Sequence, residues 1–345
     1  MTYTTTLTVD YHDQTCVVRY RRAATGTEQV LSVPTTPEAL AQLVDRARRA
    51  DGSGARVAWV QESTTGWARV QALVGDRADF QLANVLQMPR TPKAHRKKTD
   101  KVDTARMQRE FLAGDLPLAH QPPAAVRQLR RLVAWRENLV SRRTALRNWI
   151  NRYLAHETWE DRRGLWSAAG RQRLRAWLAG VPATDALVLG GKLDELDHLE
   201  GQLGQAEAAL RAAYRDSPEA QRLDAIRGIG EVAAVSIVAR IGPVGRFRSA
   251  EQLIAFAGLA PGVQQSDQTR RDGRIGGGGT DRHLRHYLIE ATVWARELPR
   301  YRATYERVAR RRGNKIGRLV VARLLLRSIY KVLRDGVAFA PSAGV

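Results

Sequence analysis

Apolar and polar residues alternate along the first part of the chain in the pattern of half-buried β-strands. Three such stretches lie at residues 4–10, 15–22 and 28–33. A helix is expected at 36–50, because Thr36 suits an N-cap and Pro37 the first helical turn. A buried strand, a short helix and another strand follow at 56–62, 65–75 and 78–86. The first three strands can form a meander, whereas the later ones need helical crossovers, so the sequence predicts a mixed sheet.

The order of these elements, three strands followed by helix, strand, helix and strand, is typical of an RNase H-like fold. The basic stretch 87–98 contains two prolines and predicts a loop. A further helix is expected from the N-cap Thr99 to about Leu112.

Two long apolar series predict a helical arm. Apolar residues recur every three or four positions within 123–155, and a second series runs from Leu189 to Tyr214. The two helices are expected to form an antiparallel coiled coil, with 157–183 as a helical insertion at its tip. Core packing accounts for the apolar stripe. The first helix contains eight arginines and only one acidic residue, Glu137. This excess of positive charge favours nucleic-acid binding with a steep salt dependence.

These patterns divide the chain into an α/β part and an all-α part. At 345 residues it is long enough for two or three domains, each with its own core. We predict an RNase H-like (RuvC-like) domain at 1–115, the coiled-coil arm at 116–216, a mostly helical C-terminal domain at 217–336 and a tail at 337–345.

The charge balance indicates a polyanionic partner. Lysine and arginine number 56 against 35 aspartates and glutamates, which gives a formal charge of +21. Such an excess favours nucleic acid over a membrane surface or a charge tuned only for solubility. The apolar runs are short, Cys16 is the single cysteine, and the N-terminus has no signal-peptide pattern. We therefore expect a cytoplasmic protein without a membrane partner.

Four carboxylates are candidates for a metal site. Asp10 and Glu62 end two of the predicted strands, and Asp100 and Asp103 share one face of the helix that follows. If the two strands are neighbours, all four can meet at one sheet edge and bind Mg²⁺ or Mn²⁺, as two ions or as one ion plus substrate. The alternative is that the acidic pair only complements the dipole of its helix.

Two further segments are candidates for phosphate chemistry. Gly228 and Gly230 lie between two apolar helical stretches, as in a helix-hairpin-helix that grips a nucleic-acid backbone, although a plain tight turn has the same pattern. Ser266 lies in an expected polar loop that is followed by arginines. An exposed serine beside cations can attack phosphorus, whereas most loop serines only cap turns.

Taken together, these segments resemble the DEDD transposases of bacterial insertion sequences, whose proteins act as RNA-guided serine recombinases. The resemblance covers nearly the whole chain and lies in LTVDYHDQTCVV, VQEST, KTDKVDTARM, IRGIGEVAA, FRSAEQLIAFAGLAPGVQQS and RHLRHYLIEA. KTDKVDT and the run that ends in Ser266 are its specific parts. Two stretches depart from the family pattern: Asp267 stands where a glycine is common, and Gly276–Gly279 followed by Thr280-Asp281 replaces a lysine and a Gly-Asn pair.

The resemblance implies a C-terminal transposase domain and a catalytic role for each of the candidate residues. Asp10, Glu62, Asp100 and Asp103 would bind the metal, and Ser266 would be the nucleophile. It also implies a homodimer or tetramer with a composite active site, target and donor DNA as substrates, and a noncoding guide RNA encoded by the element. Such a protein would work at the nucleoid of a bacterium.

We further expect a set of residues to contact nucleic acid, most of them basic and the two glycines through their backbone. They are Arg96, Lys97, Lys98, Lys101, Arg142, Arg143, Gly228, Gly230, Arg270, Arg271, Arg274, Arg282 and Arg285. A pair of histidines on one helix face, His283 and His286, is expected to meet solvent or phosphate rather than zinc.

Two other functions stay open. One is a metal-dependent hydrolytic nuclease or junction resolvase, in which water attacks phosphorus and Ser266 is structural. The other is an inactive nucleic-acid-binding remnant of a mobile element. The two departures from the family pattern favour this alternative.

Overall fold

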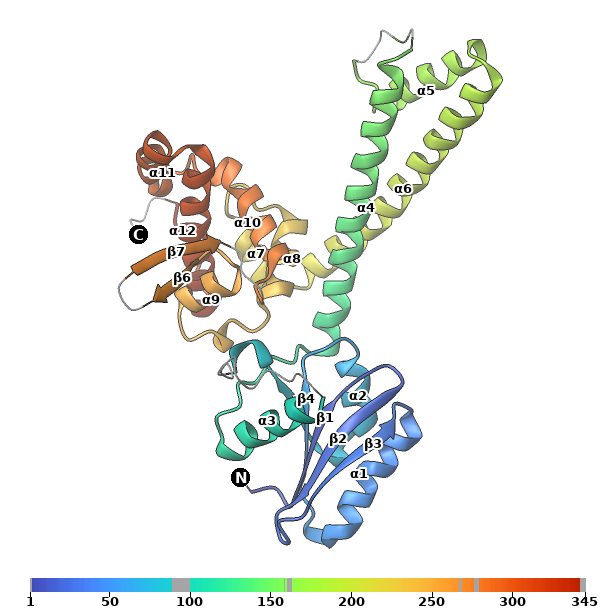
Figure 1. Ribbon diagram of the computed structural model, residues 1–345. Coiled ribbons are helices and arrows are strands. Elements are labelled where there is room, and N and C mark those ends of the chain that lie inside the picture. Colours follow the sequence, from blue (N-terminus) through green and yellow to red (C-terminus); the bar gives the residue numbers. More distant parts are fainter. Residues whose placement is uncertain are drawn as a thin grey trace. The chain divides into compact units, whose positions relative to one another are not determined.

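In the computed structural model, a five-stranded mixed sheet forms the centre of the first part of the chain (Figure 1). Its strands are β1 (Thr5–Asp10), β2 (Thr15–Arg22), β3 (Glu28–Pro34), β4 (Val57–Glu62) and β5 (Asp79–Ala83). They lie in the order β3-β2-β1-β4-β5; β1 to β3 form an antiparallel meander, while β4 and β5 run parallel to β1. The predicted mixed sheet is therefore confirmed.

Helices cover both faces of this sheet. They are α1 (Pro37–Asp51), α2 (Trp67–Val74) and α3 (Asp100–Ala113). Trp59 is buried on the face that α1 and α2 cover, whereas Val60 is buried with Met107 of α3 on the opposite face. The Thr36 hydroxyl accepts a hydrogen bond from the Ala39 amide at 3.2 Å, so it caps α1 as its sequence predicts. Single 3₁₀ turns lie at Gly52–Gly54, Gly75–Arg77 and Val85–Gln87.

The described residues are 2–88, 100–157, 159, 163–266, 269–275 and 279–341, without the side chains of residues 53, 100–101 and 261–275. They belong to two compact units, Met1–Gln121 and Pro122–Val345. Most of the predicted loop at 87–98 lies outside the described residues. Across the described ranges, no helix has both the length and the apolar character needed to cross a bilayer.

The second unit begins with a helical arm (Figure 1). The long helices are α4 (Ala124–Leu154) and α6 (Ala183–Arg215), and α5 (Ala168–Trp177) with a 3₁₀ turn at Leu178–Gly180 lies at the tip. Arg136 pairs with Glu207 at 2.9 Å, and Arg147 pairs with Glu200 at 2.5 Å. Because the partners' numbers rise along α4 and fall along α6, the two helices are antiparallel, as the apolar spacing predicts.

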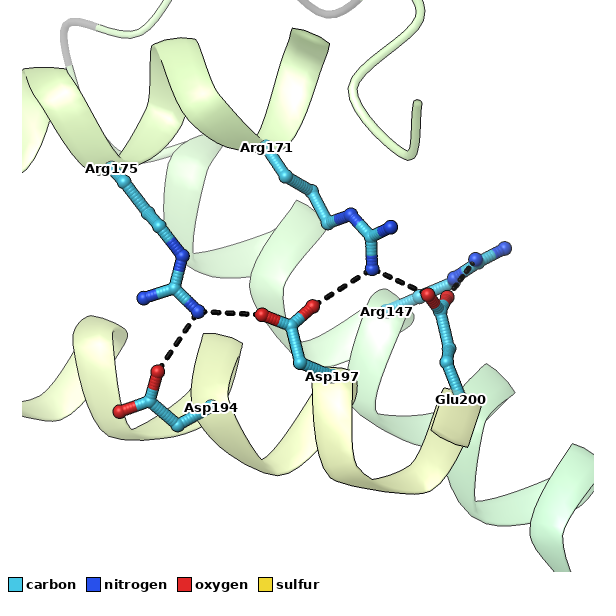
Figure 2. Close-up of polar contacts among 6 residues, drawn as sticks. All are labelled: Arg147, Arg171, Arg175, Asp194, Asp197 and Glu200. Atoms are coloured by element: carbon cyan, nitrogen blue, oxygen red, sulfur yellow. Dashed lines mark hydrogen bonds and ion pairs between the residues drawn. The ribbon is translucent and has the colours of Figure 1, made fainter. Parts of the chain in front are cut away.

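A ladder of ion pairs holds the tip of the arm together (Figure 2). Its members are Arg147 of α4, Arg171 and Arg175 of α5, and Asp194, Asp197 and Glu200 of α6. Glu200 accepts hydrogen bonds from both Arg147 and Arg171, and Asp197 accepts from Arg171 at 2.8 Å and Arg175 at 2.7 Å. These side chains hold α5 against the long helices. Arg147, one of the eight arginines counted in the first arm helix, therefore has a structural role.

The rest of the second unit is a helical body that carries one β-hairpin (Figure 1). Its elements are α7 (Pro218–Asp224), α8 (Glu231–Ile241), a 3₁₀ turn at Val244–Arg246, α9 (Ala250–Phe256), β6 (Pro261–Ser266), β7 (Thr269–Ile275), α10 (Arg282–Ala295), α11 (Pro299–Arg312) and α12 (Asn314–Asp335). The helices α7, α8, α9, α10 and α12 share one apolar core, which includes Ile237, Leu288 and Leu325. The predicted polar loop around Ser266 is wrong, because Pro261–Ser266 pairs with β7 as an antiparallel strand.

Polar contacts fasten the base of the arm to this body. The Arg130 guanidinium donates to the carbonyl oxygens of Ala239 at 2.7 Å and Arg240 at 2.9 Å. These carbonyls belong to the last turn of α8, where no later amide of the helix can reach them. Two turns further along α4, the Glu137 carboxylate contacts Nδ1 of His283 of α10. The expectation that His283 faces solvent or a phosphate is therefore wrong, because its imidazole has a carboxylate partner within the fold.

The ladder predicts that Glu200 stabilises the tip of the arm more than a surface pair would. Glu200→Gln should lower the free energy of unfolding by about 1–2 kcal/mol, since two guanidinium groups lose one shared counter-charge. Glu195→Gln is the matched control, because Glu195 is 41% exposed and pairs with Lys192, three residues earlier on the same helix; its effect should stay within about 0.5 kcal/mol. Urea unfolding followed by circular dichroism measures both, and equal effects would contradict the prediction.

Candidate active site

Asp10 and Glu62 end two strands that lie side by side. β1 and β4 are parallel, and their register pairs Thr6 with Ala58 and Thr8 with Val60. Because side chains alternate along a strand, Asp10 continues the row of Thr6 and Thr8, and Glu62 continues the row on β4. The two carboxylates therefore belong to the same end and the same face of the sheet, as the sequence predicts.

That face is the one that α3 covers. Ala58 and Val60 are buried with Met107 of α3, while Leu7 and Trp59 belong to the core on the opposite side. On α3, Thr104, Met107 and Gln108 are buried. Asp103 precedes this buried row, is partly exposed, and lies in the first turn of the helix. Asp100 begins α3, and its side chain lies outside the described residues.

The immediate surroundings of Asp10 are polar. The Asp10 carboxylate is 14% exposed and lies 3.6 Å from Nε2 of His12, which is 53% exposed. Two residues before Asp10, the Thr8 hydroxyl is buried and has no hydrogen-bond partner among the described residues. Sequence reasoning missed His12, although its place two residues beyond the strand end was a usable signal. Burial raises the pKa of the nearby Cys16 thiol, and the charge of Asp10 raises it further.

The donors of this face suit a hard divalent cation, because carboxylate and hydroxyl oxygens are the ligands that such ions prefer. Within the described side chains, no three histidine, cysteine, aspartate or glutamate residues come close enough to hold a metal ion. A metal at Asp10 and Glu62 would therefore need a further ligand from outside the described side chains. Asp100 is the candidate that the sequence supplies.

Ser266 lies in the second unit, at the end of a strand of the hairpin. It pairs with Thr269 in the register of β6 and β7, and Gln265 pairs with Arg270. Asp267 and Gln268 lie outside the described residues. The predicted nucleic-acid contacts Arg270, Arg271 and Arg274 all belong to β7. The chain thus brings these arginines onto the strand that pairs with the one ending in Ser266.

The base of the hairpin is anchored to the helical body. Arg323 of α12 donates to the Leu259 carbonyl at 2.6 Å, and Arg285 of α10 donates to the Gly258 carbonyl at 3.3 Å. The Asp281 amide also donates to the Phe256 carbonyl at 2.7 Å. Of the predicted contact residues, Arg285 therefore has a structural role at the hairpin base.

Asp281 caps α10 and faces a cluster of arginines. Its carboxylate accepts a hydrogen bond from the Leu284 amide at 2.9 Å and lies 3.8 Å from Nη1 of Arg240. Burial and, to a smaller extent, the positive charge of Arg130 lower the pKa of Arg246, which Asp281 opposes, to about 10. One carboxylate therefore faces three partly buried arginines.

The two glycines of the predicted helix-hairpin-helix differ in their surroundings. They lie in the turn between α7 and α8. Gly228 has φ +98°, and a Cβ there would lie 2.6 Å from the carbonyl oxygen of Ala291. Gly230 is exposed and caps α8, and a Cβ there would meet no described heavy atom within 4 Å. Packing against α10 thus explains Gly228, while Gly230 stays accessible to a phosphate, although Glu231 places a negative charge beside it.

The remaining predicted contacts have different surroundings. Arg142 is exposed on α4, while Arg143 is partly buried and its Nε has no hydrogen-bond partner among the described groups. Arg282 is exposed at the first residue of α10. Arg96, Lys97 and Lys98 lie outside the described residues, as does the side chain of Lys101.

Comparison with known proteins matches both stretches of the chain that contain candidate residues. A transposase family model named for the DEDD motif and IS110 matches residues 8–157, and a model of the transposase IS116/IS110/IS902 family matches residues 220–306. The first range contains the four candidate carboxylates, and the second contains Ser266.

Two curated proteins are similar to parts of the chain. A probable family 20 transposase of Pseudomonas aeruginosa is 32% identical over 179 residues, which is 50% of this chain and 51% of that protein. A transposase for insertion sequence element IS1111A from Coxiella burnetii is 32% identical over 138 residues, which is 38% of this chain and 36% of that protein. The chain thus spans about half of the first relative's length and less of the second's.

The contrast between the two glycines can be tested by matched alanine substitutions. Gly228→Ala should lower the free energy of unfolding by at least about 2 kcal/mol, because φ is left-handed and the methyl group would overlap a backbone carbonyl. Gly230→Ala should cost less than about 1 kcal/mol, because its φ of −90° suits alanine and its surroundings are open. Thermal unfolding of the two variants measures the difference; a Gly228→Ala protein as stable as Gly230→Ala would contradict the packing role.

Proposed function

Since the chain belongs to the DEDD transposases of the IS110 family, we propose that it exchanges DNA strands through a serine nucleophile assisted by a carboxylate-held divalent metal. The observation that carries the proposal is the parallel register of β1 and β4, because it brings Asp10 and Glu62 to one end of the five-stranded mixed sheet. A second support is that the family models cover these carboxylates and Ser266 alike.

In this proposal, Asp10, Glu62, Asp100 and Asp103 hold Mg²⁺ or Mn²⁺, and the bound ion would offset negative charge on the reacting phosphate. Asp10 and Glu62 are fixed by strand backbone, so their positions do not depend on a loop. Asp103 and Asp100 belong to α3, which packs on the same face of the sheet through Met107. His12 lies beside this site, with its Nε2 3.6 Å from the Asp10 carboxylate.

Ser266 would be the nucleophile. Its Oγ loses a proton and bonds to phosphorus, while the bond from phosphorus to one sugar oxygen breaks and that oxygen leaves as a hydroxyl. The phosphoserine link conserves the energy of the diester, so a second hydroxyl can displace the serine and join the strands without net hydrolysis. Arg270, Arg271 and Arg274, which belong to the adjoining strand β7, would offset the charge that develops on the phosphate.

The carboxylates and the serine belong to different compact units of the chain. A complete site therefore requires that the two units meet, within one chain or between chains. We propose the second, a composite site in a homodimer or tetramer, as the family resemblance implies. We also propose a noncoding RNA of the element as guide for target and donor DNA, with work at the bacterial nucleoid; the charge of +21 supports polyanionic partners.

A hydrolytic nuclease or junction resolvase is the second candidate. The observation that favours it is that the sheet alone supplies the carboxylates a metal-assisted attack by water would need. Ser266 would then only end a strand of the hairpin.

Covalent attachment separates the two candidates. End-labelled insertion-sequence junction DNA, the element's RNA and Mg²⁺ are incubated with protein and run on a denaturing gel. A protein–DNA adduct is expected with the wild type, and Ser266→Ala should abolish it because the attacking oxygen is gone. Thr269→Ala is the matched control, because it removes the hydroxyl of the cross-strand partner and leaves Ser266.

Nicked DNA without an adduct in all three proteins would establish hydrolysis by water. Bound but uncut DNA in all three would make the chain an inactive remnant.

Metal affinity tests the carboxylates directly. Asp10→Asn should weaken Mn²⁺ binding at least about tenfold in calorimetric titration, since a neutral amide replaces an anionic ligand. Asp13→Asn is the matched control three residues away, where the side chain is exposed beyond the strand end. Adding EDTA should stop DNA cleavage and excess Mn²⁺ should restore it. Equal Mn²⁺ affinities of the two variants would refute the site.

A further inference from the structure

A cationic pocket of about 490 Å³ lies between α10 and α12 of the helical body. Five basic side chains line it: Arg282, Arg285, His286, Lys315 and Arg318. Arg282 and Arg285 are among the residues that we expect to touch nucleic acid; the other three carry no role in the function proposed above.

The lysine and arginine side chains of this pocket have no ion-pair partner in the described part of the chain. There, none of the four lysine and arginine side chains of the pocket pairs with a carboxylate, whereas Arg136, Arg147 and Arg171 of the arm do. Like charges around one cavity repel, and an anion that enters relieves the repulsion. The pocket is therefore built for an anionic ligand.

Two of the cations are held in place before any ligand binds. Nε of Arg318 donates to the Thr292 hydroxyl at 3.0 Å and its Nη2 to the Ile289 carbonyl at 2.8 Å. Nη1 of Arg285 donates to the Gly258 carbonyl at 3.3 Å. Each guanidinium has five N–H donors, so further donors remain for a ligand. Fixing them in advance reduces the entropy that binding must overcome.

The pocket also has apolar walls, formed by Ile289 and Leu319. A duplex backbone presents only phosphate and sugar to a protein surface and makes no use of such walls. A base that has left its stack needs an apolar surface beside the cations that hold its phosphate. The volume lies in the range of pockets that take a whole small molecule, well above the need of a phosphate group alone.

We propose that this pocket binds one unpaired nucleotide of a nucleic-acid strand, with its phosphate on Arg282, Lys315 and Arg318 and its base against Ile289 and Leu319. The proposal deepens the proposed function in one respect only: it takes nucleic acid as the partner. It requires neither the serine nor the metal.

Binding of labelled oligonucleotides at fixed salt tests the pocket. Arg282→Ala combined with Lys315→Ala should weaken binding of single-stranded DNA or RNA at least about tenfold, measured by fluorescence anisotropy, while duplex affinity falls no more than about threefold. Both side chains reach solvent, so the fold should be kept. Arg310→Ala combined with Arg311→Ala removes the same charge from α11, outside the pocket, and should weaken both ligands alike.

Leu319→Ala distinguishes a site that binds a whole nucleotide from one that binds only its phosphate, because it removes part of the apolar wall and keeps every charge of the pocket. It should weaken single-strand binding about threefold or more and leave the binding of inorganic phosphate unchanged. Single-stranded DNA and RNA are titrated separately to identify the strand. Free mononucleotide is added as a competitor and should bind far more weakly than the strand.

An equal loss of single-strand and duplex affinity in the pocket double variant would overturn the proposal and leave a backbone contact. Unchanged affinity, or a mononucleotide that binds more tightly than the strand, would overturn it too. Asp10→Asn and Ser266→Ala should keep full single-strand binding, so a failure of the proposed chemistry and a failure of the pocket give different results.

Discussion

Parallel pairing of β1 with β4 is the constraint on which the placement of the candidate carboxylates depends. Side chains on a strand alternate with a period of two, so a slip of one residue in this pairing would move Glu62 to the face that α1 and α2 cover. Trp59 is buried on that face and Val60 is buried under α3. The slip would place Val60 in the space that Trp59 fills and Trp59 in the smaller space of Val60, so the packing of the two cores opposes it. The apolar cores on both faces therefore determine where the carboxylates lie.

In the second unit, the distribution of counter-charges separates structural arginines from available ones. Arg136, Arg147, Arg171 and Arg175 each meet a carboxylate, and Arg130 meets backbone carbonyls at the end of α8. The cations between α10 and α12 have no carboxylate partners within the described residues. A high count of arginines alone is thus a poor guide to where a polyanion binds, because many of them compensate acidic residues of the same fold.

Long periodic segments were predictable from the sequence. The five strands of the sheet, α1 and the arm helices follow from apolar spacing, since each must bury one face. The hairpin of Ser266 was not predictable in this way: Pro261 and Gly262 are poor strand formers, and what pairs β6 with β7 is backbone hydrogen bonding.

Contacts between distant residues were also beyond the sequence. His283 meets Glu137 across the junction of arm and body, and that pairing has no signal in the spacing of either helix. Of the candidate site, the shared strand end of Asp10 and Glu62 followed from the predicted order of elements. The role of Gly228 did not, because it depends on how closely α10 approaches the turn.

The attachment of the arm at its base gives it the mechanics of a lever. α4 has 31 residues and so is about 46 Å long. Its base is bonded to the backbone of α8 and to α10 rather than joined by a flexible linker. A rotation of about 5° there would sweep the far end through about 4 Å. Conversely, a partner that displaces the far end exerts torque on the helices that carry the β6–β7 hairpin, so a displacement at the tip can reach the strand that ends in Ser266 without any change in the contacts between them.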